Sequence, residues 1–149
     1  MTSETSYFAD LYQRFERLPP GAAAPMRRVA RPDDLRDTPG LYRLFAGTRP
    51  SDEEVNAAFV LPWCKKQSGG KKLGPVCAEG IGEARIIQIA RAAYPDDLIA
   101  LRRLVIHLQP ELGWMEVAPL VCAWGPPTKR AFVEAYYIVL HKLEQGAKA

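Results

Sequence analysis

Arginines carry the clearest chemical signal in this sequence, and they gather between Gly82 and Trp114. The first half of this stretch has apolar residues at the spacing of one helix face, namely Ile86, Ile89, Ala90 and Ala93. A step of about 100° per residue puts Arg91 opposite that face and Arg85 on its flank. No acid lies between Arg85 and Tyr94 to offset them. A guanidinium group presents five donors in a fixed fork that suits phosphate. The pattern indicates either contact with nucleic acid or a solvated basic face.

The second half of the stretch predicts another amphipathic helix, with an apolar face made by Leu98, Leu101, Val105 and Leu108. Arg103 and His107 lie one turn apart on a different face. Ile99 and Ile106 form an additional apolar patch, with Arg102 between them. A helix that is apolar on two sides is either central in its own bundle or packed against another chain. The sequence leaves both alternatives open.

Three further groups of basic residues lie outside this stretch: Arg27, Arg28, Arg31 and Arg36; Lys65, Lys66, Lys71 and Lys72; and Lys129 with Arg130. A solvated face is the ordinary explanation of each group. Arg31 and Arg36 also have acidic neighbours with which they could pair. Lys129 and Arg130 begin the last predicted helix, where cations oppose the helix dipole, and this slightly favours a functional role.

The residues that catalysis or metal binding would need are scarce. The two histidines and three cysteines show none of the short spacings of a metal site. The loop at Gly69–Lys72 lacks the phosphate-loop pattern, and no dinucleotide-binding glycine motif occurs. The acidic pairs Asp33-Asp34 and Asp96-Asp97 stand where helix starts are predicted, which explains them as dipole partners. We therefore expect no enzyme, no metal and no cofactor.

Composition indicates one ordinary globular domain. The chain has 149 residues, of which 48% are hydrophobic and 25% charged, enough for one full core and too few for two. The sequence has no run of eighteen apolar residues, so it predicts no transmembrane helix. The N-terminus lacks the basic segment followed by an apolar segment that is typical of a signal peptide. We therefore expect the protein to be located in the cytoplasm. The cysteines fit small buried hydrophobes. A net charge of +3 is low for a protein that binds nucleic acid alone.

Every strong periodic signal is helical, so the sequence predicts an all-α fold, a compact bundle of about six to eight helices. Prolines and glycines punctuate the pattern at 19–21, at 62 and at 125–127. Ser51 to Glu54 matches a capping box, and Thr128 is a candidate N-cap for the last helix. That helix is expected to bury Phe132, Tyr136, Val139, Leu140 and Leu143. We expect a single domain over 1–149, and any division into N- and C-terminal halves falls in the loop at 67–74.

The chain resembles the CasB family, the small subunit of type I-E CRISPR Cascade complexes. In the first half the resemblance lies in Arg27-Arg28-Val29, in Pro32 to Asp37, in Pro39 and in Tyr42-Arg43-Leu44. In the second half it lies in Glu83, Arg85-Ile86, Gln88, Arg91, Leu101 to Leu104, His107, Pro110, Leu112, Trp114, Trp124-Gly125 and the basic start of the last helix. It covers nearly the whole chain in order. It departs from the family pattern in a shorter loop at 67–74 and in Pro126-Pro127, which precede the last basic pair.

The resemblance implies a non-catalytic subunit of a ribonucleoprotein complex. Its partners would be the repeated backbone subunits and the large subunit of an assembly that contains crRNA, a second copy of itself, and DNA. The small subunits would hold the target strand and the displaced strand of the R-loop along a basic surface, in antiviral defence. The alternative is a helical protein–protein adaptor whose basic face binds an acidic partner.

The residues expected to contact nucleic acid follow from the basic groups and the resemblance together. The first choices are Arg28, Arg85, Arg91 and Arg103, and the second choices are Lys71, Lys72, Lys129 and Arg130. The patch of Ile99, Arg102 and Ile106 is the candidate subunit interface.

Overall fold

The computed structural model describes residues 3–108 and 112–148 and confirms the all-α fold. Pro110, one of the residues of the resemblance, lies outside the described residues. Within these ranges the chain forms nine α-helices and two short 3-10 helices, and eight of the α-helices have at least eight residues. The helices of the first half are α1 (Ser3–Glu16), α2 (Pro20–Arg28), η1 (Pro32–Asp37), α3 (Pro39–Leu44), α4 (Asp52–Val60) and η2 (Leu61–Trp63). Those of the second half are α5 (Leu73–Gly80), α6 (Glu83–Arg91), α7 (Asp96–His107), α8 (Trp114–Cys122) and α9 (Pro126–Lys148).

The helix starts follow the local chemistry of the sequence. The predicted capping box is present: Glu54 N donates to Ser51 Oγ at 3.2 Å, and Ser51 N donates to Glu54 Oε1 at 2.9 Å. Proline stands in the first turn of α2, η1 and α3, where its missing N–H is not needed. Pro62 ends α4 by turning the chain into the short helix η2.

One local prediction is wrong and one helix was missed. Helix α9 begins at Pro126, so Thr128 is not its N-cap; the Thr128 hydroxyl instead bonds to Ala123 O at 2.7 Å. The two prolines fit the first turn because that turn leaves its N–H groups unpaired. Helix α5 was not predicted, because Gly74, Pro75 and Gly80 read as loop residues in its short sequence.

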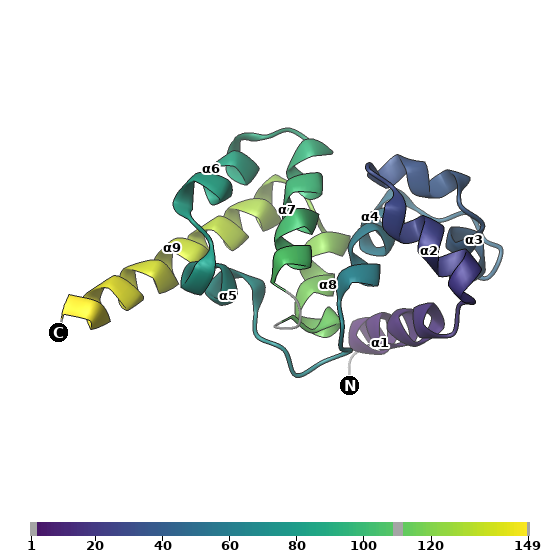
Figure 1. The fold of residues 1–149 in the computed structure, drawn as a ribbon, viewed down its shortest axis with the longest axis horizontal. Helices are drawn as coiled ribbons and strands as arrows, with labels where there is room; N and C mark the ends of the chain where they lie inside the picture. The colour runs from purple at the N-terminus through teal and green to yellow at the C-terminus, as the bar shows by residue number, and fades with distance from the viewer. Residues whose placement is uncertain (1–2, 109–111, 149) are drawn as a thin grey trace.

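The two halves lie side by side, and α8 joins them (Figure 1). Helix α8 packs against α1 and α4 of the first half and also contacts α9. Trp114 at its start is fully buried, and its Nε1 donates to Phe8 O of α1 at 2.9 Å. One hydrophobic cluster includes buried residues from both halves. The core is therefore continuous across the boundary at 67–74.

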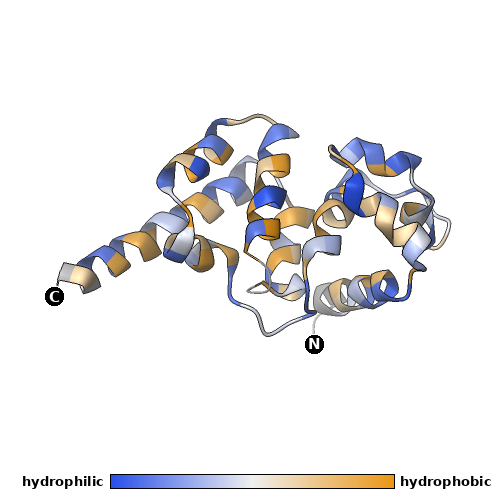
Figure 2. Cartoon of the chain, in the orientation of Figure 1, coloured by the Kyte–Doolittle hydropathy of each residue, from blue (hydrophilic) through white to orange (hydrophobic). Residues whose placement is uncertain are grey.

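The end of α9 extends beyond the rest of the molecule (Figure 1). Helix α5 covers its first part, where Phe132 and Tyr136 are buried. Farther along, apolar and polar residues alternate around a helix that no other helix covers (Figure 2). Leu143 is 45% exposed there, so the expectation that α9 buries it is wrong. None of the helices in the described ranges is long and apolar enough to cross a membrane.

A buried ion pair anchors the start of α9 to α7. Lys129 Nζ lies 3.0 Å from Asp97 Oδ2, and the two side chains are only 15% and 6% exposed. The same ammonium donates to Ala92 O at 2.9 Å. A buried carboxylate needs such a partner, since water is excluded from it.

We predict that Lys129→Met lowers the free energy of unfolding by about 3 kcal/mol, because it leaves the Asp97 carboxylate buried and unpaired. Arg130→Met is the matched control, since it removes an exposed charge from the neighbouring residue and should change stability by less than about 0.5 kcal/mol. Urea unfolding followed by circular dichroism measures both. Equal effects of the two substitutions would show that the pair contributes nothing.

Candidate nucleic-acid interface

Two of the first-choice arginines meet in a small hollow between α6 and α7. Arg85, Gln88 and Arg103 line this hollow of about 130 Å³ together with the apolar side chains of Ile89, Ala100 and Leu104. We call it the basic hollow. Its charged groups are two guanidiniums, its other polar side chain is an amide, and no acid lines it. The arrangement suits an oxygen-rich anion such as a phosphate.

The apolar faces of α6 and α7 hold these donors in place. Ile86 and Ile89 of α6 are buried, and so are Leu101 and Leu104 of α7. Packing these residues together turns Arg85 and Arg103 outward, where both are exposed. Neither guanidinium makes a hydrogen bond or ion pair with a residue that the structure describes. Their donors are therefore available to a ligand.

Arg91 lies on another side of α6. It is six residues after Arg85, which corresponds to about 120° around the helix. Its charge acts on Tyr137 of α9: burial and the Glu83 carboxylate raise the pKa of that phenol, and Arg91 lowers it. Arg91 is exposed but does not line the basic hollow. Of the first-choice arginines on α6 and α7, Arg85 and Arg103 therefore share the basic hollow, and Arg91 does not.

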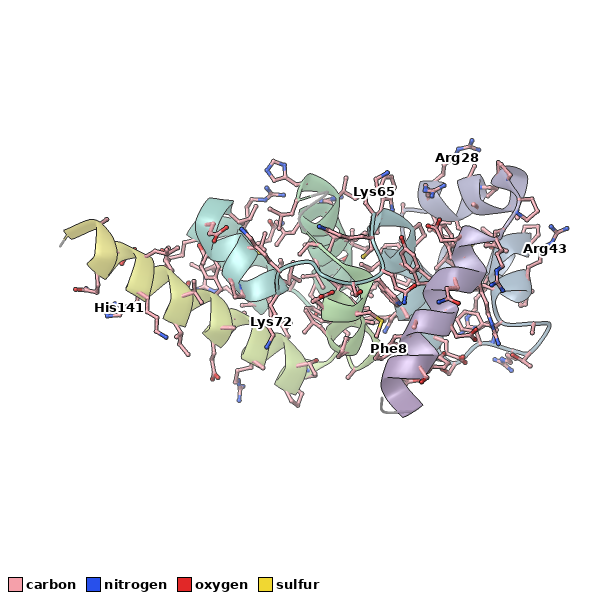
Figure 3. All side chains as sticks on the ribbon, turned by 90° about the horizontal axis from the view of Figure 1, so that it is seen from below. Phe8, Arg28, Arg43, Lys65, Lys72 and His141 are labelled. Atoms are coloured by element: carbon pink, nitrogen blue, oxygen red, sulfur yellow. The ribbon has the colours of Figure 1, made fainter. Side chains whose placement is uncertain are left out.

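Arg28 is the first-choice arginine of the first half of the chain. It is exposed at the end of α2 (Figure 3), and Val29 follows it. Val29 O accepts a hydrogen bond from Arg102 Nη2 of α7 at 2.6 Å. This bond brings the end of α2, with Arg28, next to the helix that carries Arg103. Arg28 also stabilises α2 as a cation in its last turn.

Two other arginines of the first group have contacts within the chain. The Arg27 guanidinium lies 5.3 Å from the centre of the Phe15 ring. Arg36 donates to Pro50 O at 3.1 Å and pairs with Asp52 at 2.9 Å. The acidic partner of Arg36 is thus Asp52 of α4 and none of its close neighbours in sequence.

The lysines Lys71 and Lys72 are exposed on the segment that links the two halves. Figure 3 labels Lys72 on this segment. Lys71 Nζ lies 3.5 Å from Glu79 Oε2, so part of its charge is offset. The segment itself is held against the start of α8, where Trp114 N donates to Lys66 O at 2.8 Å. A Cβ atom on Gly70 would lie 2.2 Å from Gly113 N, so glycine is needed for this close approach.

Lys129 and Arg130 have different surroundings. The partly buried Lys129 ammonium bonds to Asp97 and to Ala92 O, as described above. Arg130 is exposed, and it lines another hollow of about 360 Å³ with Ala90, Pro126, Lys129 and Val133. We therefore keep Arg130 and leave Lys129 out of the surface that we propose for nucleic acid.

The candidate subunit patch on α7 is mostly used inside the chain. The Arg102 guanidinium lies 3.9 Å from the centre of the Phe59 ring of α4, and Ile99 packs against the core. Burial, and secondarily the charge of Arg103, lowers the pKa of Arg102. These contacts favour the alternative in which α7 is central in its own bundle. Ile106, at 36% exposed, is the residue of the patch that offers apolar surface to a partner.

The cysteine thiols are unsuited to nucleophilic chemistry. Cys64 and Cys77 are buried, and burial raises the pKa of each to about 12. A thiol with so high a pKa supplies almost no thiolate near neutral pH. Among the described residues, no three side chains of His, Cys, Asp or Glu gather closely enough to hold a metal ion.

Gln88 is the polar residue of the basic hollow that was not among the residues expected from the sequence to contact nucleic acid. It follows Arg85 by three residues, and residues at that spacing are neighbours on a helix surface. This spacing could have identified it. Residue spacing could not have shown that Arg103 of α7 completes the hollow, because no local sequence pattern determines how α6 and α7 pack against each other.

Two comparisons with known proteins find similar chains. The chain is 32% identical to the CRISPR system Cascade subunit CasB of Escherichia coli K12, over 89% of this chain and 93% of that protein. It also matches a chain in the crystal structure of E. coli Cascade bound to a PAM-containing double-stranded DNA target. That match has a TM-score of 0.76 and 31% identity and covers 89% of this chain and 95% of the other. No family model matches the sequence.

We predict that Cys64 and Cys77 do not react with Ellman's reagent at pH 8 in the folded protein and react at once in urea. The Cys122→Ser variant isolates these two thiols, because Cys122 is less buried. Rapid reaction of the folded variant would contradict the burial of the thiols.

Since folding raises both pKa values above that of an unfolded thiol, the free energy of unfolding should fall as the pH rises from about 9 toward 12. Urea unfolding over this pH range measures the fall.

Proposed function

The chain belongs to the CasB family, the non-catalytic small subunits of type I-E CRISPR Cascade complexes, and we propose that it holds the DNA strands of the R-loop along a basic surface. The surface consists of the basic hollow, Arg28, Arg91 and Arg130, with Lys71 and Lys72 as secondary contacts. Its other partners would be the repeated backbone subunits, the large subunit, crRNA within the assembly and a second copy of the chain.

The observation that carries this proposal is the basic hollow. Arg85 and Arg103 come from different helices, line one concavity and make no hydrogen bond or ion pair with described residues. Two guanidiniums that only kept the protein in solution would repel each other less if they lay apart. Their convergence is favourable when an anion lies between them. A DNA phosphate is such an anion.

Contacts of this kind fit the task of the complex from which the relative comes. In RNA-guided recognition, base pairing reads the sequence, and the exchange of one duplex for another is nearly balanced in energy. Protein contacts to the phosphate backbone then shift the balance without adding sequence preference. A hollow whose charged groups are both guanidinium donors can supply such contacts at any sequence.

The low net charge is consistent with the same proposal. A net charge of +3 is modest for a protein that must capture DNA by itself. Inside an assembly, the other subunits hold the strand close to this one, which raises its effective concentration. A few phosphate contacts are then sufficient.

We predict that the double substitution Arg85→Glu/Arg103→Glu weakens target binding by the reconstituted complex at least about 100-fold, since each charge-assisted contact is worth about 1.5–3 kcal/mol. The control is Arg43→Glu/Arg49→Glu, which makes the same change of charge at exposed residues outside the basic hollow. Arg43 lies at the end of the molecule farthest from α9 (Figure 3). Gel-shift titration with a matched double-stranded target measures both.

The neutral variant Arg85→Gln/Arg103→Gln adds a test of mechanism. Each lost phosphate contact should reduce the slope of log K against log salt by about 0.7 to 0.9. Equal losses in the Glu variant and its control would indicate general electrostatics and contradict the specific role of the hollow. Binding of this chain to a partner that single-stranded DNA does not compete for would favour the adaptor alternative.

A further inference from the structure

A large hollow lies on the flank of α6 that faces α9, away from the basic hollow. Its volume is about 360 Å³, and its lining residues are Ala90 of α6 and Pro126, Lys129, Arg130 and Val133 of α9. We call it the α6–α9 hollow. Ala90 follows Arg85 by five residues, which corresponds to about 140° around the helix. Because α6 contacts both α7 and α9, it has a hollow on each of two flanks.

The two hollows differ in size and in chemistry. The basic hollow has a volume of about 130 Å³ and offers two guanidiniums to an anion. The α6–α9 hollow is much larger, and its walls include the apolar side chains of Ala90, Pro126 and Val133. A phosphate alone would leave these apolar walls exposed to water. The α6–α9 hollow therefore suits a ligand that has an apolar body as well as a negative charge.

Arg130 supplies the available charge of the α6–α9 hollow. The Lys129 ammonium is bonded to Asp97 and to Ala92 O, so it is already neutralised. Arg130 is exposed and makes no hydrogen bond or ion pair with a residue that the structure describes. Among the described residues that line the hollow, none is acidic. A planar guanidinium in this place can attract a phosphate and can also stack on a flat ring.

The outward face of α6 joins the two hollows by a polar surface. Gln88 and Arg91 lie on this face, opposite the buried Ile86 and Ile89, and both are exposed. A helix with its side chains is about 10–12 Å across, so a short single strand can cross it. Such a strand passes from the basic hollow over Gln88 and Arg91 to the α6–α9 hollow.

Single-stranded nucleic acid has the two features that this surface requires. It carries a phosphate for the basic hollow and, a short way along the strand, a flat base with apolar faces. In a duplex the bases are paired and stacked, so none of them is free to enter a hollow. Every base has such a face, so this contact tolerates any sequence. An acidic peptide is the rival ligand, and the continuity of the surface across α6 favours the strand.

We propose that the α6–α9 hollow receives an unstacked base of a DNA single strand whose phosphate lies in the basic hollow. The proposal rests on the proposed function for the phosphate contact and adds a contact to the base. The surface around α6 then binds a single strand more tightly than a duplex, because only the single strand can fill both hollows.

The first experiment compares two probes on the full chain at low salt. One is a short oligothymidylate, and the other is an abasic oligomer of equal length, which keeps the phosphates and lacks the bases. NMR follows the Val133 methyl signals, assigned with Val133→Ile, and the Nε–H signals of Arg85 and Arg103. We expect oligothymidylate to shift both sets of signals. The abasic oligomer should shift only the arginine signals.

The variant Ala90→Leu tests the hollow by filling it. Leucine adds no charge and is well tolerated in a helix, so the fold should be kept, which circular dichroism checks. The variant should bind oligothymidylate about fivefold more weakly, the low end of the range for one stacked base. Its binding of the abasic oligomer should not change. The control is Ala131→Leu, at an exposed alanine of α9 that does not line this hollow, and it should bind both probes like the unchanged protein.

Three outcomes would overturn the proposal. They are equal Val133 shifts with the two oligomers, equal affinities of Ala90→Leu and the unchanged chain for oligothymidylate, and a larger Val133 shift with an oligo-glutamate peptide than with oligothymidylate. The arginine signals report on the proposed function separately. If neither oligomer moved them, the phosphate contact would fail, and a Val133 shift with oligothymidylate alone would still show that the hollow binds a base.

The second experiment tests the base contact in the assembly. Target binding by the reconstituted complex is measured by gel-shift titration with a normal displaced strand and with one that carries abasic residues. The abasic strand should weaken binding more for the unchanged chain than for Ala90→Leu, because the variant has already lost the contact. The comparison of the two chains cancels the effect of the missing bases on the duplex. Equal effects of the abasic strand on both chains would overturn the assignment of the hollow to a base.

Discussion

The stacking of Arg102 between the two halves is the interaction on which the functional surface depends. Its guanidinium lies over Phe59 of α4 and donates to Val29 O at the end of α2. This side chain belongs to the second half of the chain, and both of its partners belong to the first. Because Arg102 points inward, the next residue, Arg103, is turned by about 100° to the outside. One internal contact thus determines which arginine of the pair is available to a ligand.

The charged residues of the chain divide into those that build the fold and those left on its surface. Arg102, Lys129, Asp97 and Arg36 form bonds within the chain, across boundaries between helices. Arg85 and Arg103 converge on one hollow, and Asp33 and Glu53 on another. The modest net charge of +3 is therefore the sum of basic and acidic groups that lie in different places on the surface.

Local sequence signals predicted most of the helices, because those signals act within a few residues. The capping box at Ser51, the proline stops and the 3.6-residue periodicity of α6 and α7 all correspond to features of the structure. Helix α5 was missed because it is short, contains glycine and proline, and is stabilised by packing along α9. The prediction that Thr128 is the N-cap was wrong because a proline can stand in the first turn of a helix and does not only end one. Pro126 and Pro127 therefore belong to the first turn of α9.

The sequence by itself determined the all-α class, the helices that carry the arginines and the family to which the chain belongs. These depend on the periodicity of apolar residues, on capping residues and on residues that occur in the same order as in the family. All of these signals are contained in the order of residues along the chain. Only the tertiary structure decided that Arg103 meets Arg85, that Arg91 lies apart from them, and that Lys129 is buried against Asp97. It also joined Asp33 of η1 to Asn56 and Tyr94. The physical reason is that a side chain's availability depends on what the rest of the chain packs against it, and no local pattern contains that information.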